Sequence, residues 1–155
     1  MSHSSYQRVL GRLGRALGLL AILAACGSDD PLGENFRSRE VRTAEVRWRA
    51  AGSSHYAFKA SAACCGAGIG TTDVVVQAGR VISVRVRSNG RDLPTTSAQP
   101  IDSMFALVRR ELSRDPTNLQ VTYDATLGYP RTIYWGPPSF EGRNYLGADS
   151  VVILR

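Results

Sequence analysis

The stretch Asp73–Val86, DVVVQAGRVISVRV, decides the fold because two runs of β-branched residues flank one short turn. β-Branched side chains favour strands, and Gly79 can adopt the positive φ that a tight hairpin turn needs. The second run alternates apolar and polar residues, so one set is expected to face a core: Ile82, Val84 and Val86. The stretch therefore predicts an antiparallel hairpin with one buried face.

Alternation of the same kind precedes the hairpin in HYAFKASAAC, residues 55–64. Its apolar set should share one face of a strand: Tyr56, Phe58, Ala60, Ala62 and Cys64. The glycine-rich GAGIG that follows, residues 66–70, predicts a loop. Its glycines suggest a phosphate-binding loop only superficially, because the residues after it favour a strand and a phosphate loop leads into a helix.

Three more strands are expected near the C-terminus, because short β-rich runs alternate there with turn residues. They are LQVTYDA (119–125), RTIYW (131–135) and SVVIL (150–154). The proline- and glycine-rich segment 136–147 predicts the loop before the last strand.

Two helices are predicted by apolar residues at helical spacing. Residues 36–51 place five apolar side chains at that spacing: Phe36, Val41, Ala44, Trp48 and Ala51. A second helix begins at Pro100, with Asp102 in the first turn, where a carboxylate favours the helix dipole. Its apolar stripe consists of Ile101, Met104, Phe105, Val108 and Leu112.

The predicted order is therefore α-β-β-β-α-β-β-β. Helices and strands of this kind build an α+β domain, here an antiparallel sheet with two helices packed on one face. We expect residues 36–155 to form this single domain, a length that suffices for one core.

The N-terminus predicts export and lipid attachment. Basic residues precede a run of ten apolar and small residues, Ala16–Ala25, which is typical of a signal peptide and short for a membrane span. The run ends in LAAC, which resembles the bacterial lipobox. We therefore expect residues 1–25 to be removed and Cys26 to carry the lipid anchor, with residues 26–35 as a polar tether.

The net charge of +6 does not indicate a nucleic-acid ligand. Three arginines belong to the signal segment, and from Cys26 onward 16 basic residues oppose 13 acidic ones. No basic patch with interleaved aromatic residues is visible in the sequence. No cofactor is predicted either.

The adjacent cysteines Cys64 and Cys65 admit two interpretations. They can form a vicinal disulfide or act as redox-active thiols in an oxidising compartment, although neighbouring residues lie below the usual disulfide span. Alternatively, Cys64 is buried on the sheet and Cys65 points outward. His55 is the single histidine after Cys26, so the sequence predicts no multi-histidine metal site and no catalytic site.

The motifs, taken in order, resemble a family of small bacterial lipoproteins, the domain of unknown function 6174. The residues that carry the resemblance are Trp48, Tyr56 with Phe58 before Cys64, the VVVQAGRV hairpin, Ile101-Asp102 with Phe105, and Tyr123-Asp124 with Gly128-Tyr129-Pro130. The resemblance implies a lipoprotein whose motif residues serve structure or binding. This chain departs from the pattern in its adjacent cysteines and in the lone Asp149 near the last strand, so a cation site is not carried over.

Together these patterns predict a lipid-anchored envelope protein with a non-enzymatic binding role, on the outer membrane facing the periplasm if the cell is Gram-negative. The expected partner is an envelope protein or a glycan. Aromatic residues gather between 123 and 145, where they can line a binding groove or cover the core. The alternative is a redox-active or small-ligand or cation-binding periplasmic protein that uses Cys64 and Cys65.

Overall fold

The computed structural model describes residues 32–52, 54–64, 67–137, 139 and 142–154, and Gly33–Arg155 forms one compact unit. Its elements are α1 (Leu32–Ala50), β1 (His55–Cys64), β2 (Ala67–Gln77), β3 (Arg80–Val86), the short 3₁₀-helix η1 (Thr95–Ser97), α2 (Ile101–Arg114), β4 (Gln120–Tyr123), β5 (Pro130–Trp135) and β6 (Asn144–Ile153). The predicted order of helices and strands is confirmed.

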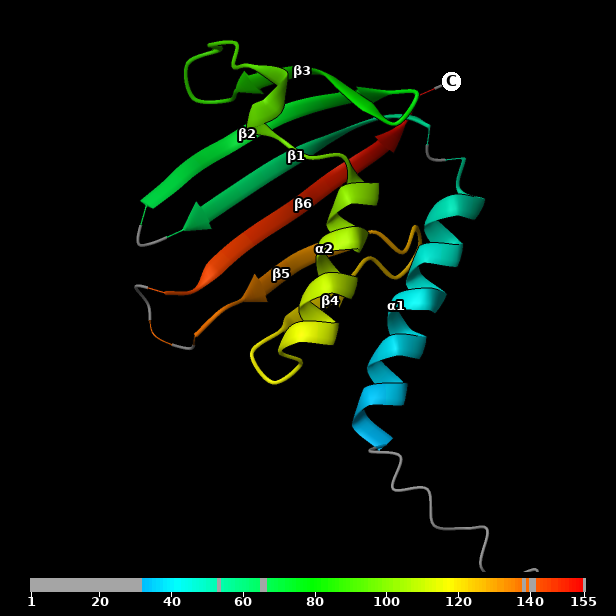
Figure 1. Ribbon diagram of the computed structural model, residues 1–155. Helices are drawn as coiled ribbons and strands as arrows, with labels where there is room; N and C mark the ends of the chain where they lie inside the picture. Colours follow the sequence, from blue (N-terminus) through cyan, green and yellow to red (C-terminus); the bar gives the residue numbers. More distant parts are fainter. Residues whose placement is uncertain (1–31, 53, 65–66, 138, 140–141, 155) are drawn as a thin grey trace, which may run out of the picture. The chain divides into compact units, whose positions relative to one another are not determined.

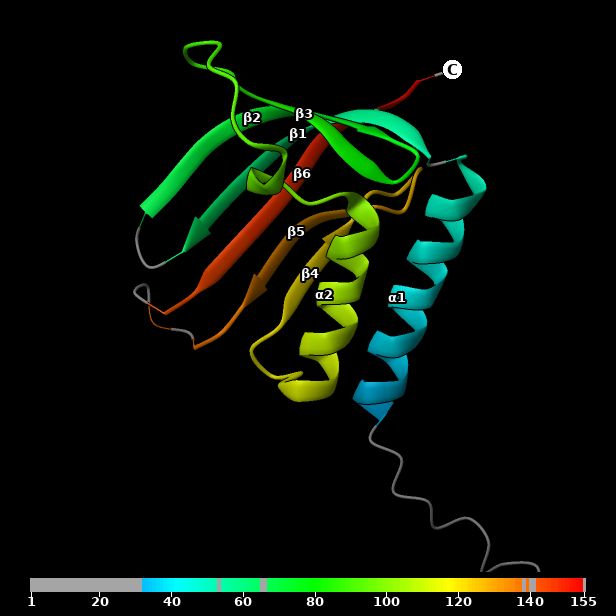
Figure 2. The ribbon, with the colours of Figure 1, turned by 45° about the horizontal axis from the view of Figure 1, so that its top comes forward.

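The strands form one antiparallel sheet with the order β3-β2-β1-β6-β5-β4. Each three-strand meander follows one helix, and the pairing of β1 with β6 joins the two meanders. Both helices lie on the same face of the sheet (Figures 1 and 2). The expected α+β class, with two helices on one face, is therefore correct.

The β2–β3 hairpin turns at Ala78 and Gly79, as its sequence predicts. Both residues have positive φ, 50° and 73°, which is the pattern of a two-residue turn that matches the twist of the strands. The prediction for Ile82 is wrong. A bulge pairs Val76 with Val81 and Val75 with Ser83, so Ile82 falls outside the alternation and is 51% exposed.

The predicted starts of β2 and β6 are also wrong. β2 begins at Ala67, inside the predicted glycine-rich loop, where Gly70 has a φ of 78° beside a register shift. β6 begins at Asn144, six residues before the predicted strand at 150. Asn and Gly disfavour strands in isolation, but pairing with both β1 and β5 overrides that preference here.

Helix α1 begins at Leu32, within the predicted tether, and ends at Ala50. The sequence before it offers a helix-start signal, because Pro31 precedes the helix and an acidic residue follows in its first turn. Val41, Ala44 and Trp48 are buried as predicted, but Phe36 is 63% exposed. Phe36 lies off the buried stripe because it precedes Val41 by five residues rather than by three or four.

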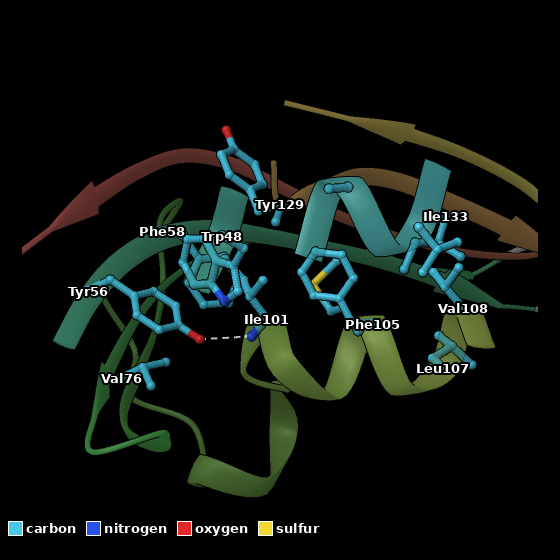
Figure 3. Close-up of a cluster of buried hydrophobic side chains, with 14 of the residues drawn as sticks. Trp48, Tyr56, Phe58, Val76, Ile101, Phe105, Leu107, Val108, Tyr129 and Ile133 are labelled. Atoms are coloured by element: carbon cyan, nitrogen blue, oxygen red, sulfur yellow. Dashed lines mark hydrogen bonds between the residues drawn. The ribbon is translucent and has the colours of Figure 1, made fainter. Parts of the chain in front are cut away.

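The core lies between the helices and the sheet. Helix α2 contributes every residue of its predicted stripe, and the sheet contributes alternate residues from β1, β2, β3 and β5. Figure 3 shows α2 side chains meeting Tyr56, Phe58 and Ile133 from the strands. One polar link crosses this core, because the buried hydroxyl of Tyr56 accepts a hydrogen bond of 2.8 Å from the backbone N–H of Ile101. Tyr56 thereby satisfies a donor at the start of α2, where Pro100 provides no side-chain cap.

Candidate functional site

The aromatic motif residues converge inside the core. Trp48 meets Tyr56 edge-on at 4.9 Å between ring centroids, and it meets Tyr129 at 6.2 Å. Tyr56 lies 5.9 Å from Phe58. These four side chains are buried, and so are Phe105 and Pro130. Their arrangement joins the end of α1, the start of β1 and the start of β5 (Figure 3).

The turn between β4 and β5 gives Asp124 a structural role. One carboxylate oxygen of Asp124 accepts hydrogen bonds from the backbone N–H groups of Thr126 (2.9 Å) and Leu127 (2.7 Å). The backbone of Asp124 also pairs with Tyr129 and Gly128. A short acidic side chain that satisfies the N–H groups after it is typical of turns, so Asp124 fixes the shape of this one.

Gly128 brings the same turn against α1. It has a φ of 81°, and a side chain there would overlap the backbone carbonyl oxygen of Ala44. The guanidinium of Arg47 donates a 2.8 Å hydrogen bond to the carbonyl oxygen of Ala125 and closes the contact from the helix side. The turn therefore docks on α1 through backbone atoms.

The remaining motif residues, Tyr123 and Asp102, have separate positions. Tyr123 stacks on Phe105 at 6.3 Å, and its buried hydroxyl has no hydrogen-bond partner among the described residues. Asp102 is exposed in the first turn of α2, the position that the sequence predicts for a dipole-stabilising carboxylate.

Stability at alkaline pH is expected to depend on the buried tyrosines. Burial raises the pKa of Tyr56 and of Tyr123 above the ordinary value of about 10. Above that pH the unfolded chain loses these protons while the folded chain keeps them. The contribution of the two tyrosines to the free energy of unfolding is therefore complete below pH 10 and declines as the pH rises. Urea denaturation between pH 8 and pH 11 should show a falling free energy of unfolding.

Substituting each tyrosine by phenylalanine separates the two hydroxyls. Tyr56→Phe should lower the free energy of unfolding at pH 8 by about 1–3 kcal/mol, because the N–H of Ile101 loses its acceptor. Tyr123→Phe should leave it unchanged or raise it, since that hydroxyl has no partner in the described part of the chain. Both variants should show a shallower alkaline decline. Equal losses for both variants at pH 8 would contradict this assignment.

Comparison with known families identifies the chain. Residues 40–138 match the model of a family of unknown function, DUF6174. The chain belongs to DUF6174. Searches of curated proteins and of solved structures found no significant match. The match covers the core aromatics and the docked turn, so in this DUF6174 chain the motif residues lie where they support the fold.

The cysteines of this DUF6174 chain are placed only in part. Cys64 ends β1, where its backbone is opposite Ala67 of β2. Cys65, the side chain of Cys64 and the predicted lipid site Cys26 lie outside the described residues. Their predicted thiol and anchoring roles stay predictions.

The sheet face that is turned away from the helices, called the open face below, is the candidate binding site. No helix covers this face among the described elements (Figures 1 and 2). Residues directly opposite each other across four strands form a row of small and hydroxyl side chains: Thr122, Thr132, Gly147 and Ser61. Gly147 contributes no side chain to this row, and the Tyr145 hydroxyl and Ser61 Oγ occupy the space beside it.

A shallow depression of about 440 Å³ lies along this row. It is lined by Ser61, Thr122, Tyr123, Arg131, Thr132, Tyr145, Ala148 and Asp149. Two bulges supply its charges: Arg131 is the extra residue between the β4–β5 pairs, and Asp149 precedes Ser150, whose φ is 53°. The Arg131 guanidinium and the Asp149 carboxylate lie 3.6 Å apart. The depression thus combines hydroxyl groups with one cation and one anion.

Tyr145 lines the edge of the depression, and Tyr134 packs against it from the neighbouring strand. Their rings lie 4.9 Å apart, and the Tyr145 hydroxyl is 3.1 Å from the hydroxyl of Ser61. The guanidinium of Arg143 lies 4.7 Å from the Tyr134 ring and donates a hydrogen bond to Gln120. Of the described aromatic residues between 123 and 145, these two lie on the open face, and Phe140 lies outside the described residues. Tyr129 is buried, and Tyr123 and Trp135 pack against the core.

Sequence analysis missed the hydroxyl row because its members belong to four strands. The alternation of Ala57, Lys59 and Ser61 in β1 is the one local signal that marks the open face. Within the described residues, no cluster of three or more His, Cys, Asp or Glu side chains can hold a metal ion. Neither described helix is both long and apolar enough to cross a bilayer.

Proposed function

We propose that this DUF6174 chain is a lipid-anchored protein of the bacterial cell envelope whose open sheet face binds another envelope component. The anchor is supported by the signal-like segment 1–25 and by LAAC before Cys26. Two or three acyl chains on one cysteine would hold the protein on the membrane, since a single chain binds only marginally. The outer membrane, facing the periplasm, is the proposed location in a Gram-negative cell.

The observation that carries the binding role is the uncovered depression on the sheet. In an α+β domain the helices cover one face, and the other face is free for recognition. Here that face holds a depression that is lined by hydroxyl groups. The Arg131–Asp149 pair and the edge of Tyr145 supply directional contacts beside it.

The lining favours a ligand rich in hydroxyl groups, such as an envelope glycan. The hydroxyls of Thr122 and Thr132 are 2.6 Å apart, and Ser61 continues the row. Hydroxyl side chains both donate and accept hydrogen bonds, as sugar hydroxyls do. The Tyr145 ring at the edge of the depression supplies apolar ring surface for the carbon face of a sugar.

A protein partner is the second candidate. Tyr134, Tyr145 and Arg143 form one contact cluster, and tyrosine and arginine are enriched among residues that dominate protein interfaces. The redox and cation-binding alternative rests on Cys64 and Cys65 in the sequence alone.

Photo-crosslinking from the open face tests the proposal. The photoreactive amino acid p-benzoylphenylalanine in place of Thr122, an exposed residue of the depression, should give crosslinked products in intact cells. The same substitution at Ala106, exposed on α2, is the matched control. If a glycan-degrading enzyme lowers the mass of the crosslinked product, the partner is a glycan. If protease reduces the product to the same fragments that it releases from the uncrosslinked protein, the partner is a protein. Equal yields from the two positions would refute binding at the open face.

Gly147→Ala gives a second, subtler test of the same face. The new methyl group would lie 2.7 Å from Ser61 Oγ and would overlap the hydroxyl of Tyr145. Both obstacles are the ends of side chains, which can rotate away, so the fold should persist while the depression loses its shape. The crosslinking yield at position 122 should fall several-fold with little change in thermal stability.

A further inference from the structure

The outward face of α1 exposes two of the four large apolar side chains that lie at the surface among the described residues. Phe36 is 63% exposed and Val46 is 61% exposed. At 100° per residue Val46 lies opposite the buried residues Val41, Ala44 and Trp48, and Phe36 lies about 80° from Val46, on the flank of that outward side. The helix therefore has an apolar stripe directed away from the sheet.

Positive charge surrounds this stripe. Between residues 36 and 49, five arginines oppose two glutamates. Arg39 and Arg42 are exposed, and both lie near the outward side of the helix. One of the glutamates, Glu45, is already bound to two arginines, Arg49 at 2.7 Å and Arg109 at 2.7 Å. The outward face of α1 therefore carries net positive charge beside exposed apolar groups.

The chain length before α1 limits how far this face can be from a membrane. Five residues, Gly27–Pro31, separate the proposed lipid site Cys26 from the first residue of the helix. Even fully extended, this segment spans at most about 20 Å. Because the helix begins earlier than the sequence predicts, the tether is four residues shorter than expected.

We propose that the outward face of α1 lies on the anionic surface of the membrane that holds the lipid anchor. Phe36 and Val46 enter the interface between headgroups and acyl chains, and the arginines contact the headgroup phosphates. This inference rests on the anchor in the proposed function. The charge and the short tether favour a lipid surface over a soluble partner.

This contact would orient the whole domain. The helices lie between the sheet and the membrane, so the open face with its depression is directed away from the bilayer (Figure 2). A ligand in the periplasm would then reach the hydroxyl row without obstruction from lipid.

Vesicle binding tests the inference on the mature chain, residues 26–155 with Cys26→Ser, which contains the whole compact unit. Flotation with vesicles containing phosphatidylglycerol should show binding that weakens with salt and is much weaker on phosphatidylcholine alone. The double variant Phe36→Ser/Val46→Ser should bind at least about tenfold more weakly. Arg42→Gln should weaken binding about fivefold.

The chain offers a matched control for exposed apolar surface. Ile82 and Val152 are 51% and 57% exposed and belong to strands β3 and β6. Ile82→Ser/Val152→Ser should bind vesicles like the parent chain. No vesicle binding by the parent chain, or an equal loss in both double variants, would overturn the proposed orientation. Incorporation of labelled palmitate, expected to be lost in full-length Cys26→Ser, tests the anchor separately and so distinguishes failure of the anchor from failure of the α1 contact.

Discussion

Gly128→Ala is expected to lower the free energy of unfolding by about 3–5 kcal/mol, a large part of the stability of a domain of this size. Two costs add. An alanine with a φ near 81° adopts the left-handed conformation that side chains disfavour. Its methyl group also overlaps the carbonyl oxygen of Ala44 and lies 2.9 Å from the Cβ of Arg47. Backbone atoms cannot rotate away, so the β4–β5 turn must separate from α1.

Gly90→Ala is the control that isolates the conformational cost. Gly90 has a φ of 69°, and a Cβ there would meet nothing within 4 Å. Gly90→Ala should therefore lower the free energy of unfolding by only about 1–2 kcal/mol. Urea denaturation of both variants measures the difference. If both variants lowered the free energy of unfolding by the same amount, glycine would be needed at position 128 only for its positive φ. The overlap of the added methyl group with α1 would then cost nothing.

Local patterns were sufficient to predict much of this fold. The hairpin in Asp73–Val86 and the apolar stripe of α2 were confirmed, apart from Ile82, and the alternation in β1 was confirmed for Tyr56, Phe58 and Ala60. The α+β class could be predicted from these elements, because a sheet with one apolar face needs a layer of helices to cover that face. These elements are specified by residues close together in the chain.

The incorrect predictions share a different cause. Ile82 is displaced by a bulge, and β6 extends to Asn144 because two neighbouring strands pair with it. Neither effect leaves a local signal, because both depend on the register between paired strands, within the hairpin for Ile82 and with sequence-distant β1 for β6. Phe36 was assigned to the core because its spacing was near helical, but its direction relative to Trp48 excludes it from the buried stripe.

The candidate site was the least predictable part for the same reason. Gly147 reads as a loop residue in the sequence, yet in the sheet it is a neighbour of Ser61 and Thr132. Its missing side chain lets the Tyr145 hydroxyl reach Ser61 across the strand. A glycine inside a strand often marks such a close approach, and this rule is informative only once the strand itself is known.

Trp48→Ala should have an effect comparable to that of Gly128→Ala, because Trp48 is the largest of the side chains that are fully buried. Replacing a buried tryptophan by alanine typically costs about 3–5 kcal/mol through lost burial and the cavity that remains. The indole N–H has no partner in the described part of the chain, so no hydrogen bond is lost with it. The expected loss is therefore one of packing against Tyr56 and Tyr129.

Trp48→Ala should also increase local opening of α1, in addition to lowering the stability of the whole domain. Val41 and Ala44 are the other buried hydrophobic residues on the described part of α1, and both are smaller. Hydrogen exchange should accelerate first in α1 and in the β4–β5 turn that docks on it, because local opening follows the loss of buried contacts. Trp135→Ala, which replaces a partly buried tryptophan on β5, is the matched control and should lower the free energy of unfolding less.

If exchange rose equally across all six strands, α1 would be unfolding only together with the sheet. In that case the proposed membrane contact of α1 would stabilise the entire domain, and anchored protein should then resist urea more than the unlipidated chain does.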